Sequence, residues 1–163
     1  MTQLKRDPGN PLLSSSKEAP WELMAAFNPC VARQGGTYHL VYRAQSVLAD
    51  VGGTPMSLSS VGYASSTGGV HFSGRRPLIQ PEHRWERYGC EDPRVSYVEA
   101  LDHYVMTYTA LSERGPRIAI AISDDLFHWH RLGPASFRNY HGIGFVDVDD
   151  KDASVFSALV PDP

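Results

Sequence analysis

The chemically richest segment of the chain is residues 89–94, in which two adjacent carboxylates, Glu91 and Asp92, precede Pro93 and Arg94. An apolar run follows directly, so the segment is predicted to open a β-strand. A carboxylate and a guanidinium at a strand end are groups that chemistry on a sugar C–O bond requires. An aspartate before a proline also commonly closes a turn, and the residue types alone favour that plainer role for Asp92.

Two further polar strand openings resemble this segment. Asn28 precedes Pro29 near the N-terminus, and Asp150, Lys151 and Asp152 follow one another near the C-terminus. The amide of Asn28 can hold sugar hydroxyls, because it both donates and accepts hydrogen bonds. Three openings, each separated by about one sheet, predict a ring of sheets around a polar centre.

Strand signals dominate the rest of the chain. Residues 37–43 and 104–109 are rich in aromatic and β-branched side chains, residues 61–66 have a similar pattern, and isoleucines alternate with alanines over residues 118–122. Clusters of Gly, Pro, Asn, Asp and Ser separate these runs, as short turns require. The sequence therefore predicts an all-β fold.

The predicted strands also repeat. Tyr38 and Tyr42 recur 66 positions later, and Ala64 and Ser66 recur 57 positions later. A unit of four short strands is typical of a propeller blade. The unit of about 60 residues is longer than the roughly 40–50 of the commonest propeller repeats, and the extra length falls in loops. A β-sandwich with coincidental tyrosine spacing is the alternative.

The chain is accordingly expected to be one partial β-propeller domain, residues 1–163. The first blade is predicted at about residues 28–80, the second at about 91–133, and the start of a third at about 150–163. Four-stranded blades of this length leave room for only about two and a half of them.

Six short segments carry a resemblance to a known family. In chain order they are Phe27-Asn28-Pro29, Val41-Tyr42-Arg43-Ala44, Gly89-Cys90-Glu91-Asp92-Pro93-Arg94, Met106-Thr107-Tyr108-Thr109-Ala110, Pro116-Arg117-Ile118-Ala119 and Asp150-Lys151-Asp152-Ala153. Together they are similar to glycoside hydrolase family 130, which contains β-mannoside phosphorylases and some β-mannosidases. The resemblance implies a five-bladed β-propeller with its site at the central axis, and inverting phosphorolysis or hydrolysis of β-mannosides.

The resemblance further implies that Asp92 is the general acid, whose proton reaches the leaving oxygen through a sugar hydroxyl. A phosphate nucleophile needs a cationic cradle and no catalytic base, whereas water must be activated by a second carboxylate. Inorganic phosphate is then a co-substrate, and no cofactor is expected. Lys151 is the candidate phosphate ligand, although some members of the family carry an Arg-Asn pair where Lys151 and Asp152 stand.

The predicted substrate-binding residues are Asn28, Arg43, Tyr88, Glu91, Arg94 and Asp152. Arg43 ends a strand and suits a bidentate contact to a sugar diol or phosphate, or it is merely solvated there. Tyr88 could supply a stacking face for a sugar ring. Because adjacent strand residues point to opposite faces, only one of Glu91 and Asp92 is expected to face the axis directly. Arg94 shares the parity of Asp92 and could pair with it, or it forms an ordinary strand-end salt bridge.

Composition and charge argue against several other classes of protein. The 163 residues, 42% hydrophobic and 20% charged, are ordinary for a soluble domain, and a net charge of −3 does not suit a nucleic-acid binder. No apolar run is long enough to span a membrane, and the N-terminus lacks the apolar core of a secretion signal. Cys30 and Cys90 are expected to be free thiols in a cytoplasmic protein. The histidines show no ligand spacing, so no metal site is expected.

Three hypotheses about function stay open, because the five-bladed ring of the family needs about twice this length. The first is a fragment of an enzyme that acts on β-mannoside oligosaccharides, with the rest on a longer gene product. The second is a non-catalytic carbohydrate-binding or interaction module from a truncated propeller. The third is a homo-oligomer, in which open sheet edges associate to complete a ring.

Overall fold

The computed structural model describes residues 3 and 5–161 of the chain. Its elements are η1 (Pro20–Glu22), β1 (Ala25–Gln34), β2 (Thr37–Val51), β3 (Thr54–Ser66), β4 (Ser73–Ile79), η2 (Arg84–Glu86), β5 (Gly89–Val98), β6 (His103–Ser112), β7 (Gly115–Ser123) and β8 (His130–Pro134). The all-β prediction is confirmed, and the four strongest predicted runs lie within β2, β3, β6 and β7.

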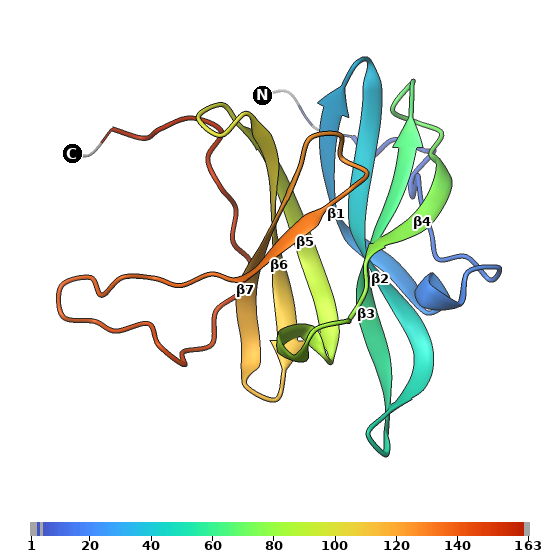
Figure 1. Ribbon diagram of the computed structural model, residues 1–163. Coiled ribbons are helices and arrows are strands. Elements are labelled where there is room, and N and C mark those ends of the chain that lie inside the picture. Colours follow the sequence, from blue (N-terminus) through green and yellow to red (C-terminus); the bar gives the residue numbers. More distant parts are fainter. Residues whose placement is uncertain (1–2, 4, 162–163) are drawn as a thin grey trace.

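The strands form two four-stranded antiparallel sheets, which lie side by side in Figure 1. The first sheet has the order β1-β2-β3-β4 and the second has the order β5-β6-β7-β8, each with neighbours joined in sequence. A single parallel bridge between Ser59 of β3 and Gly89 of β5 connects them. Each sheet is a propeller-type blade, and we call them the first blade and the second blade.

The main hydrophobic core fills the space between the two blades. Val41, Val61, Tyr63 and Ile79 of the first blade pack with residues of β5, β6 and β7, and all are almost fully buried. Inward side chains that alternate along each strand create this packing, as sheet-on-sheet contacts require. We call β1 and β5, the first strand of each blade, the inner strands, and β4 and β8, the last strand of each blade, the outer strands. The packing between the blades holds the two inner strands at a fixed separation.

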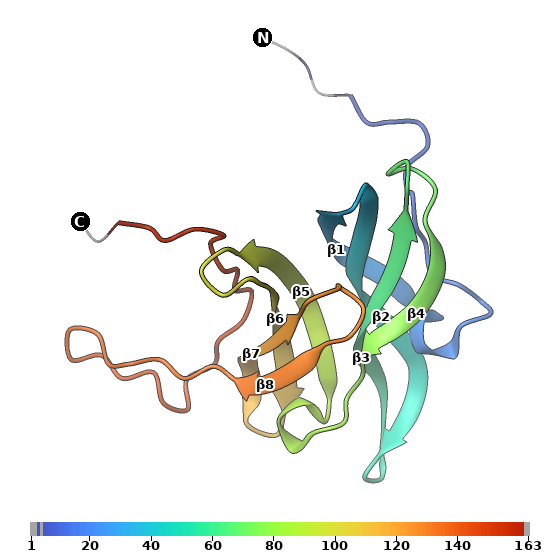
Figure 2. The same cartoon turned by 45° about the horizontal axis from the view of Figure 1, so that its top comes forward.

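The outer face of each blade is covered by irregular chain. Leu13 and Trp21, from the segment before β1, pack on Leu40 and Tyr42 of the first blade. On the second blade, the chain beyond β8 leaves the sheet as a long loop and then returns past it (Figure 2). There Thr107 donates a hydrogen bond to the carbonyl of Ala153 over 2.6 Å.

Residues 135–161 contain no strand, and their only regular pairing is an isolated bridge between Tyr140 and Ile143. Asp150 is nevertheless anchored to the second blade, because its amide donates to the carbonyl of Pro116 and its carboxylate accepts from the amide of Ile118. The predicted third blade therefore stays a prediction. Among the described residues, no helix has the length and apolar character needed to cross a lipid bilayer.

Candidate functional site

The inner strand of each blade is interrupted at the same point by a β-bulge. In β1, Asn28 and Pro29 together face the single residue Tyr42, and in β5, Asp92 and Pro93 together face Tyr108. Asn28 has φ 48° and Asp92 has φ 50°, the left-handed region that Asn and Asp tolerate best among non-glycine residues. A bulge re-aims the side chain that it carries, and such bulges are frequent next to active sites.

The two bulges bring Asn28 and Asp92 into contact across the blades. The side-chain amide of Asn28 donates a hydrogen bond of 2.6 Å to Oδ1 of Asp92. Asp92 is only 7% exposed, so this contact is shielded from most of the solvent. Two residues that lie 64 positions apart in the sequence thus form one polar pair between β1 and β5.

Arg43 of β2 completes this cluster. Its guanidinium lies 2.6 Å from Oε1 of Glu91 and 3.7 Å from Oδ1 of Asp92, and its Nε donates to the hydroxyl of Ser59 over 2.9 Å. The guanidinium also lies over the ring of Phe27, with 4.9 Å to the centroid. These contacts leave Arg43 only about one-fifth exposed, so the alternative of a merely solvated arginine is wrong.

Two geometric details differ from a regular strand pattern. Glu91 and Asp92 both contact Arg43, although alternation sends adjacent side chains to opposite faces, and which of the two faces the propeller axis stays a prediction. Arg94 makes no ion pair with Asp92 among the described residues, and it donates instead to the carbonyls of Pro93 and Asn28. The cause in both cases is the bulge between Glu91 and Arg94, which breaks the two-residue period.

Tyr88 and the pair Lys151–Asp152 lie apart from this cluster. Tyr88 is half-buried, and desolvation together with a hydrogen bond to Glu113 raises its pKa. Lys151 and Asp152 are both more than half exposed and contact each other over 3.4 Å. Asp152 has φ 58°, so it repeats the backbone conformation of Asn28 and Asp92. In the described part of the chain, no hydrogen bond or ion pair joins these three residues to Asp92.

Behind each bulge lies a buried glutamate that sequence reasoning missed. Glu22 accepts a hydrogen bond from the hydroxyl of Tyr42, and Glu86 accepts one from the hydroxyl of Tyr108. Burial, together with the neighbouring carboxylate, raises the pKa of both tyrosines far above the ordinary value. The sequence did contain one indication of these glutamates. The pairs Trp21-Glu22 and Trp85-Glu86 are 64 positions apart, which is also the separation of Asn28 and Asp92.

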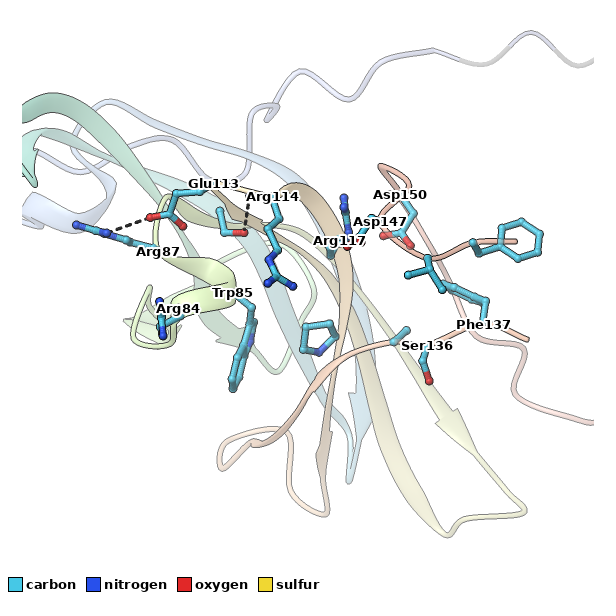
Figure 3. A pocket seen from close by; sticks show the side chains of 15 residues that line it. Arg84, Trp85, Arg87, Glu113, Arg114, Arg117, Ser136, Phe137, Asp147 and Asp150 are labelled. Carbon is cyan, nitrogen blue, oxygen red and sulfur yellow. Dashed lines mark hydrogen bonds and ion pairs between the residues drawn. The ribbon is translucent and has the colours of Figure 1, made fainter. Parts of the chain in front are cut away.

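A hollow of about 810 Å³ lies elsewhere on the second blade. Figure 3 shows Arg84 and Trp85 of the η2 turn on one side, Arg114 beside the β6–β7 turn, and Phe137 beyond it. Asn28, Arg43, Glu91 and Asp92 do not line this hollow. Within residues 3 and 5–161, no group of three or more His, Cys, Asp or Glu side chains could hold a metal ion.

The cluster of Asn28, Arg43, Glu91 and Asp92 has the parts needed to bind a sugar and transfer a proton. Asp92 is a buried carboxyl group that accepts a hydrogen bond from the amide of Asn28. The guanidinium of Arg43 lies beside it and has the geometry to bind a sugar diol or an anion. The carboxylate of Glu91 forms an ion pair with Arg43, and this contact orients the guanidinium. The geometry suits a single acid acting together with a nucleophile from elsewhere.

Comparison with known proteins gives consistent matches. Residues 4–157 match the family described as β-1,4-mannooligosaccharide phosphorylase. A 1,2-β-oligomannan phosphorylase of Thermoanaerobacter sp. (strain X514) is 33% identical over 96% of this chain and 50% of its own length. The chain thus spans about half the length of the curated relatives that it matches.

Solved structures agree with these relatives. The crystal structure of a glycosyl hydrolase from Bacteroides ovatus is 32% identical, with a TM-score of 0.69 over 84% of this chain and 42% of that one. A second structure comes from a family of mannoside phosphorylases described as containing glycoside hydrolases that target β-1,2-mannosidic linkages in Candida mannan. It is 32% identical, with a TM-score of 0.66 over 84% of this chain and 42% of that one.

Proposed function

Because the chain belongs to glycoside hydrolase family 130, we propose that it supplies the general acid and part of the sugar site of an enzyme that cleaves β-mannosides with inversion. The observation that carries this proposal is the meeting of Asn28, Arg43 and Asp92 between the two inner strands. The names of the relatives support a mannoside substrate, and most of them support phosphorolysis.

In the proposed reaction Asp92 donates its proton toward the glycosidic oxygen, either directly or through a sugar hydroxyl, as the C–O bond to the leaving sugar breaks. An oxygen of inorganic phosphate attacks the anomeric carbon from the opposite face. The products are α-mannose 1-phosphate and the shortened sugar. If water attacks instead, a second carboxylate must accept its proton, and the product is mannose.

The proposed roles of the other residues follow from their contacts. Asn28 orients the carboxyl group of Asp92 through the 2.6 Å hydrogen bond, and it can exchange that bond for one to a sugar hydroxyl. Glu91 holds Arg43, which is then aimed at a sugar diol or at phosphate. Arg94, Tyr88 and Asp152 as substrate contacts remain proposals.

Lys151 is proposed as a phosphate ligand. Its ammonium group is exposed and contacts only Asp152 among the described residues. Inorganic phosphate and a β-mannoside oligosaccharide are the proposed reactants, and a homo-oligomer is a further proposal. A sugar-binding module without turnover is the second candidate, because the amide of Asn28 and the guanidinium of Arg43 can bind sugar hydroxyls without any chemical step.

The test is an assay of the purified chain with a panel of β-mannosyl disaccharides, with and without phosphate. Mannose 1-phosphate that forms only with phosphate, and is lost in Asp92→Asn, would support the phosphorylase. Free mannose that forms regardless of phosphate would support the hydrolase. Sugar binding by calorimetry with no product from any disaccharide would overturn the catalytic proposal in favour of the binding module.

A further inference from the structure

Each bulge is backed by a buried set of three side chains. The first triad is Glu22, Tyr42 and Arg75, and the second triad is Glu86, Tyr108 and Arg131. Both glutamates are fully buried, and each stands six positions before the polar residue of its bulge, Asn28 or Asp92. The same arrangement at both bulges calls for a common physical explanation.

In the second triad the carboxylate of Glu86 is surrounded by donors. The hydroxyl of Tyr108 donates over 2.8 Å, and a guanidinium nitrogen of Arg131 donates over 2.5 Å. The backbone amides of Glu82 and His83 add weaker contacts of 3.4 and 3.3 Å. Glu86 therefore ties the η2 turn, strand β6 and strand β8 to one point.

The first triad repeats this geometry in the first blade. Tyr42 donates to Glu22 over 2.7 Å, and Arg75 donates to it over 2.9 Å. Arg75 also donates to the carbonyl of Ser14 over 2.6 Å, which attaches the N-terminal segment. Glu22 thus joins η1, strand β2 and strand β4, as Glu86 joins the matching elements of the second blade.

The tyrosine of each triad is the residue that faces the bulge. Tyr108 stands opposite Asp92 and Pro93, and Tyr42 stands opposite Asn28 and Pro29. In a bulge two residues face one, so the single residue determines where the extra residue sits. A tyrosine fixed at its hydroxyl to a buried carboxylate cannot slide along the ladder without breaking that bond. The register of each bulge is therefore tied to its triad.

From this register we propose that both triads are positioning devices for the catalytic pair, an inference that rests on the proposed function. The second triad holds the bulge that aims Asp92, and the first triad holds the bulge that aims Asn28. The 2.6 Å hydrogen bond between Asn28 and Asp92 forms only when both bulges keep their place. Tyr42 and Tyr108 act through the bulges and are not themselves catalytic.

Stability alone is a poor reason for such triads. Replacing a buried charged set with apolar side chains of similar volume is often neutral or stabilising. Two copies at matched positions are better explained by the geometry that they impose, because a misplacement of about 1 Å in a catalytic group can cost about 100-fold in rate. A purely structural role would not require either triad to lie opposite a bulge.

The test compares Tyr108→Phe with Tyr63→Phe. Tyr63 is also buried and its hydroxyl also has a side-chain partner, Nδ1 of His39 at 2.9 Å, but it pairs with Val41 of β2 and Arg76 of β4 and does not face the bulge of β1 or of β5. The first readout is the NMR signal of the side-chain amide of Asn28, with Asp92→Asn as the reference for a missing carboxylate. We expect Tyr108→Phe to move this signal toward its position in Asp92→Asn, and Tyr63→Phe to leave it in place.

The second readout is turnover of the disaccharide that the wild-type chain cleaves. We expect Tyr108→Phe to lower kcat by about tenfold with KM nearly unchanged, since the acid is displaced and the sugar contacts persist. A second variant, Glu86→Gln, removes the charge of Glu86 but keeps a side-chain oxygen that can accept the hydrogen bond from the hydroxyl of Tyr108. The Asn28 signal of Glu86→Gln should therefore stay closer to wild type than that of Tyr108→Phe.

The outcomes separate the two proposals. An unmoved Asn28 signal in folded Tyr108→Phe, or an equal shift in Tyr63→Phe, would overturn the positioning role. A moved signal in a chain that cleaves no mannoside would support the positioning role and overturn the proposed function. Thermal melts of all the variants establish that each comparison is made between folded proteins.

Discussion

The first blade and the second blade carry the same bulge at the same point of the inner strand, but the first places Asn28 there and the second places Asp92. The residues beside the bulge differ as well. In the first blade Phe27 pairs with Arg43, and in the second Glu91 pairs with Thr109. Arg43 of one blade then contacts Glu91 of the other. The two blades share the same backbone bulge, and the polar cluster is formed by the side chains that differ between them.

The largest expected effect comes from making the second blade resemble the first. Asp92→Asn removes the only ionisable group of the central pair, and general acid catalysis is worth about 10²–10⁴ in rate. We therefore expect mannoside turnover to fall by that factor with the fold intact. The double variant Asn28→Asp, Asp92→Asn should stay at the same low level, because it moves the acid to the other strand and turns it away from its position beside Arg43.

The matched control for this prediction is Asp102→Asn. Asp102 also has a positive φ, 54°, but it is exposed in the turn between β5 and β6. Its replacement should leave turnover unchanged. Recovery of activity in the double variant would show that the two bulges are interchangeable and would remove the basis of the comparison.

The next largest effect concerns the triads. Glu86→Ala should lower the free energy of unfolding by about 3–5 kcal/mol, because it leaves the mostly buried Arg131 with only the exposed Glu82 as an ionic partner and leaves the hydroxyl of Tyr108 without its acceptor. Glu22→Ala should cost less, since the side chain of Arg75 is 29% exposed and that of Arg131 only 14%. Urea unfolding of both variants measures the difference. Equal losses in the two blades would contradict this ranking.

The frame of the molecule was more predictable from the sequence than its site. The tyrosine repeat revealed both blades, because Tyr42 and Tyr108 occupy matched strands and recur at one spacing. The parity argument did not describe the contacts of Glu91 and Arg94, because a bulge inserts a residue and period-two reasoning assumes that none is inserted. The signal for the bulge was present, since an Asn or Asp before Pro stood at both places.

The buried glutamates could not be inferred from residue type. A glutamate is almost never fully buried unless it is paired, so Glu22 and Glu86 looked like surface residues. Their partners Arg75 and Arg131 come from distant outer strands, and no local pattern joins them. Only the recurrence of Trp-Glu at the spacing of the bulges carried this information.

A smaller effect separates backbone strain from hydrogen bonding at the first bulge. Asn28→Gly should lose only the hydrogen bond to Asp92, because glycine adopts a positive φ without strain. Asn28→Ala should lose the same bond and also meet the left-handed penalty of about 1–2 kcal/mol. Thermal or urea unfolding should therefore rank Asn28→Ala below Asn28→Gly by about that amount. Equal stabilities would mean that the bulge relaxes when its side chain is removed.

The smallest predicted effect tests the contact between the blades away from the site. His39 is 6% exposed and its Nδ1 is hydrogen-bonded to the hydroxyl of Tyr63 over 2.9 Å, and the ring of Phe127 from the second blade packs on both. Burial lowers the pKa of His39 below its ordinary value of 6.5, although the carboxylate of Asp125 opposes the change. The guanidinium of Arg76, which stacks on Phe127, is the other charge in this contact.

A histidine whose pKa is lowered by folding binds protons more readily in the unfolded chain. Its contribution to stability is therefore fully present above pH 6.5 and is lost as the pH falls below that value. We expect this group to decrease the free energy of unfolding on acidification from about pH 7.5 to 5.5. His39→Gln should remove that part of the slope, and His71→Gln, at an exposed position, should keep it. If both variants retain the wild-type slope, the contact between the blades does not depend on a neutral His39.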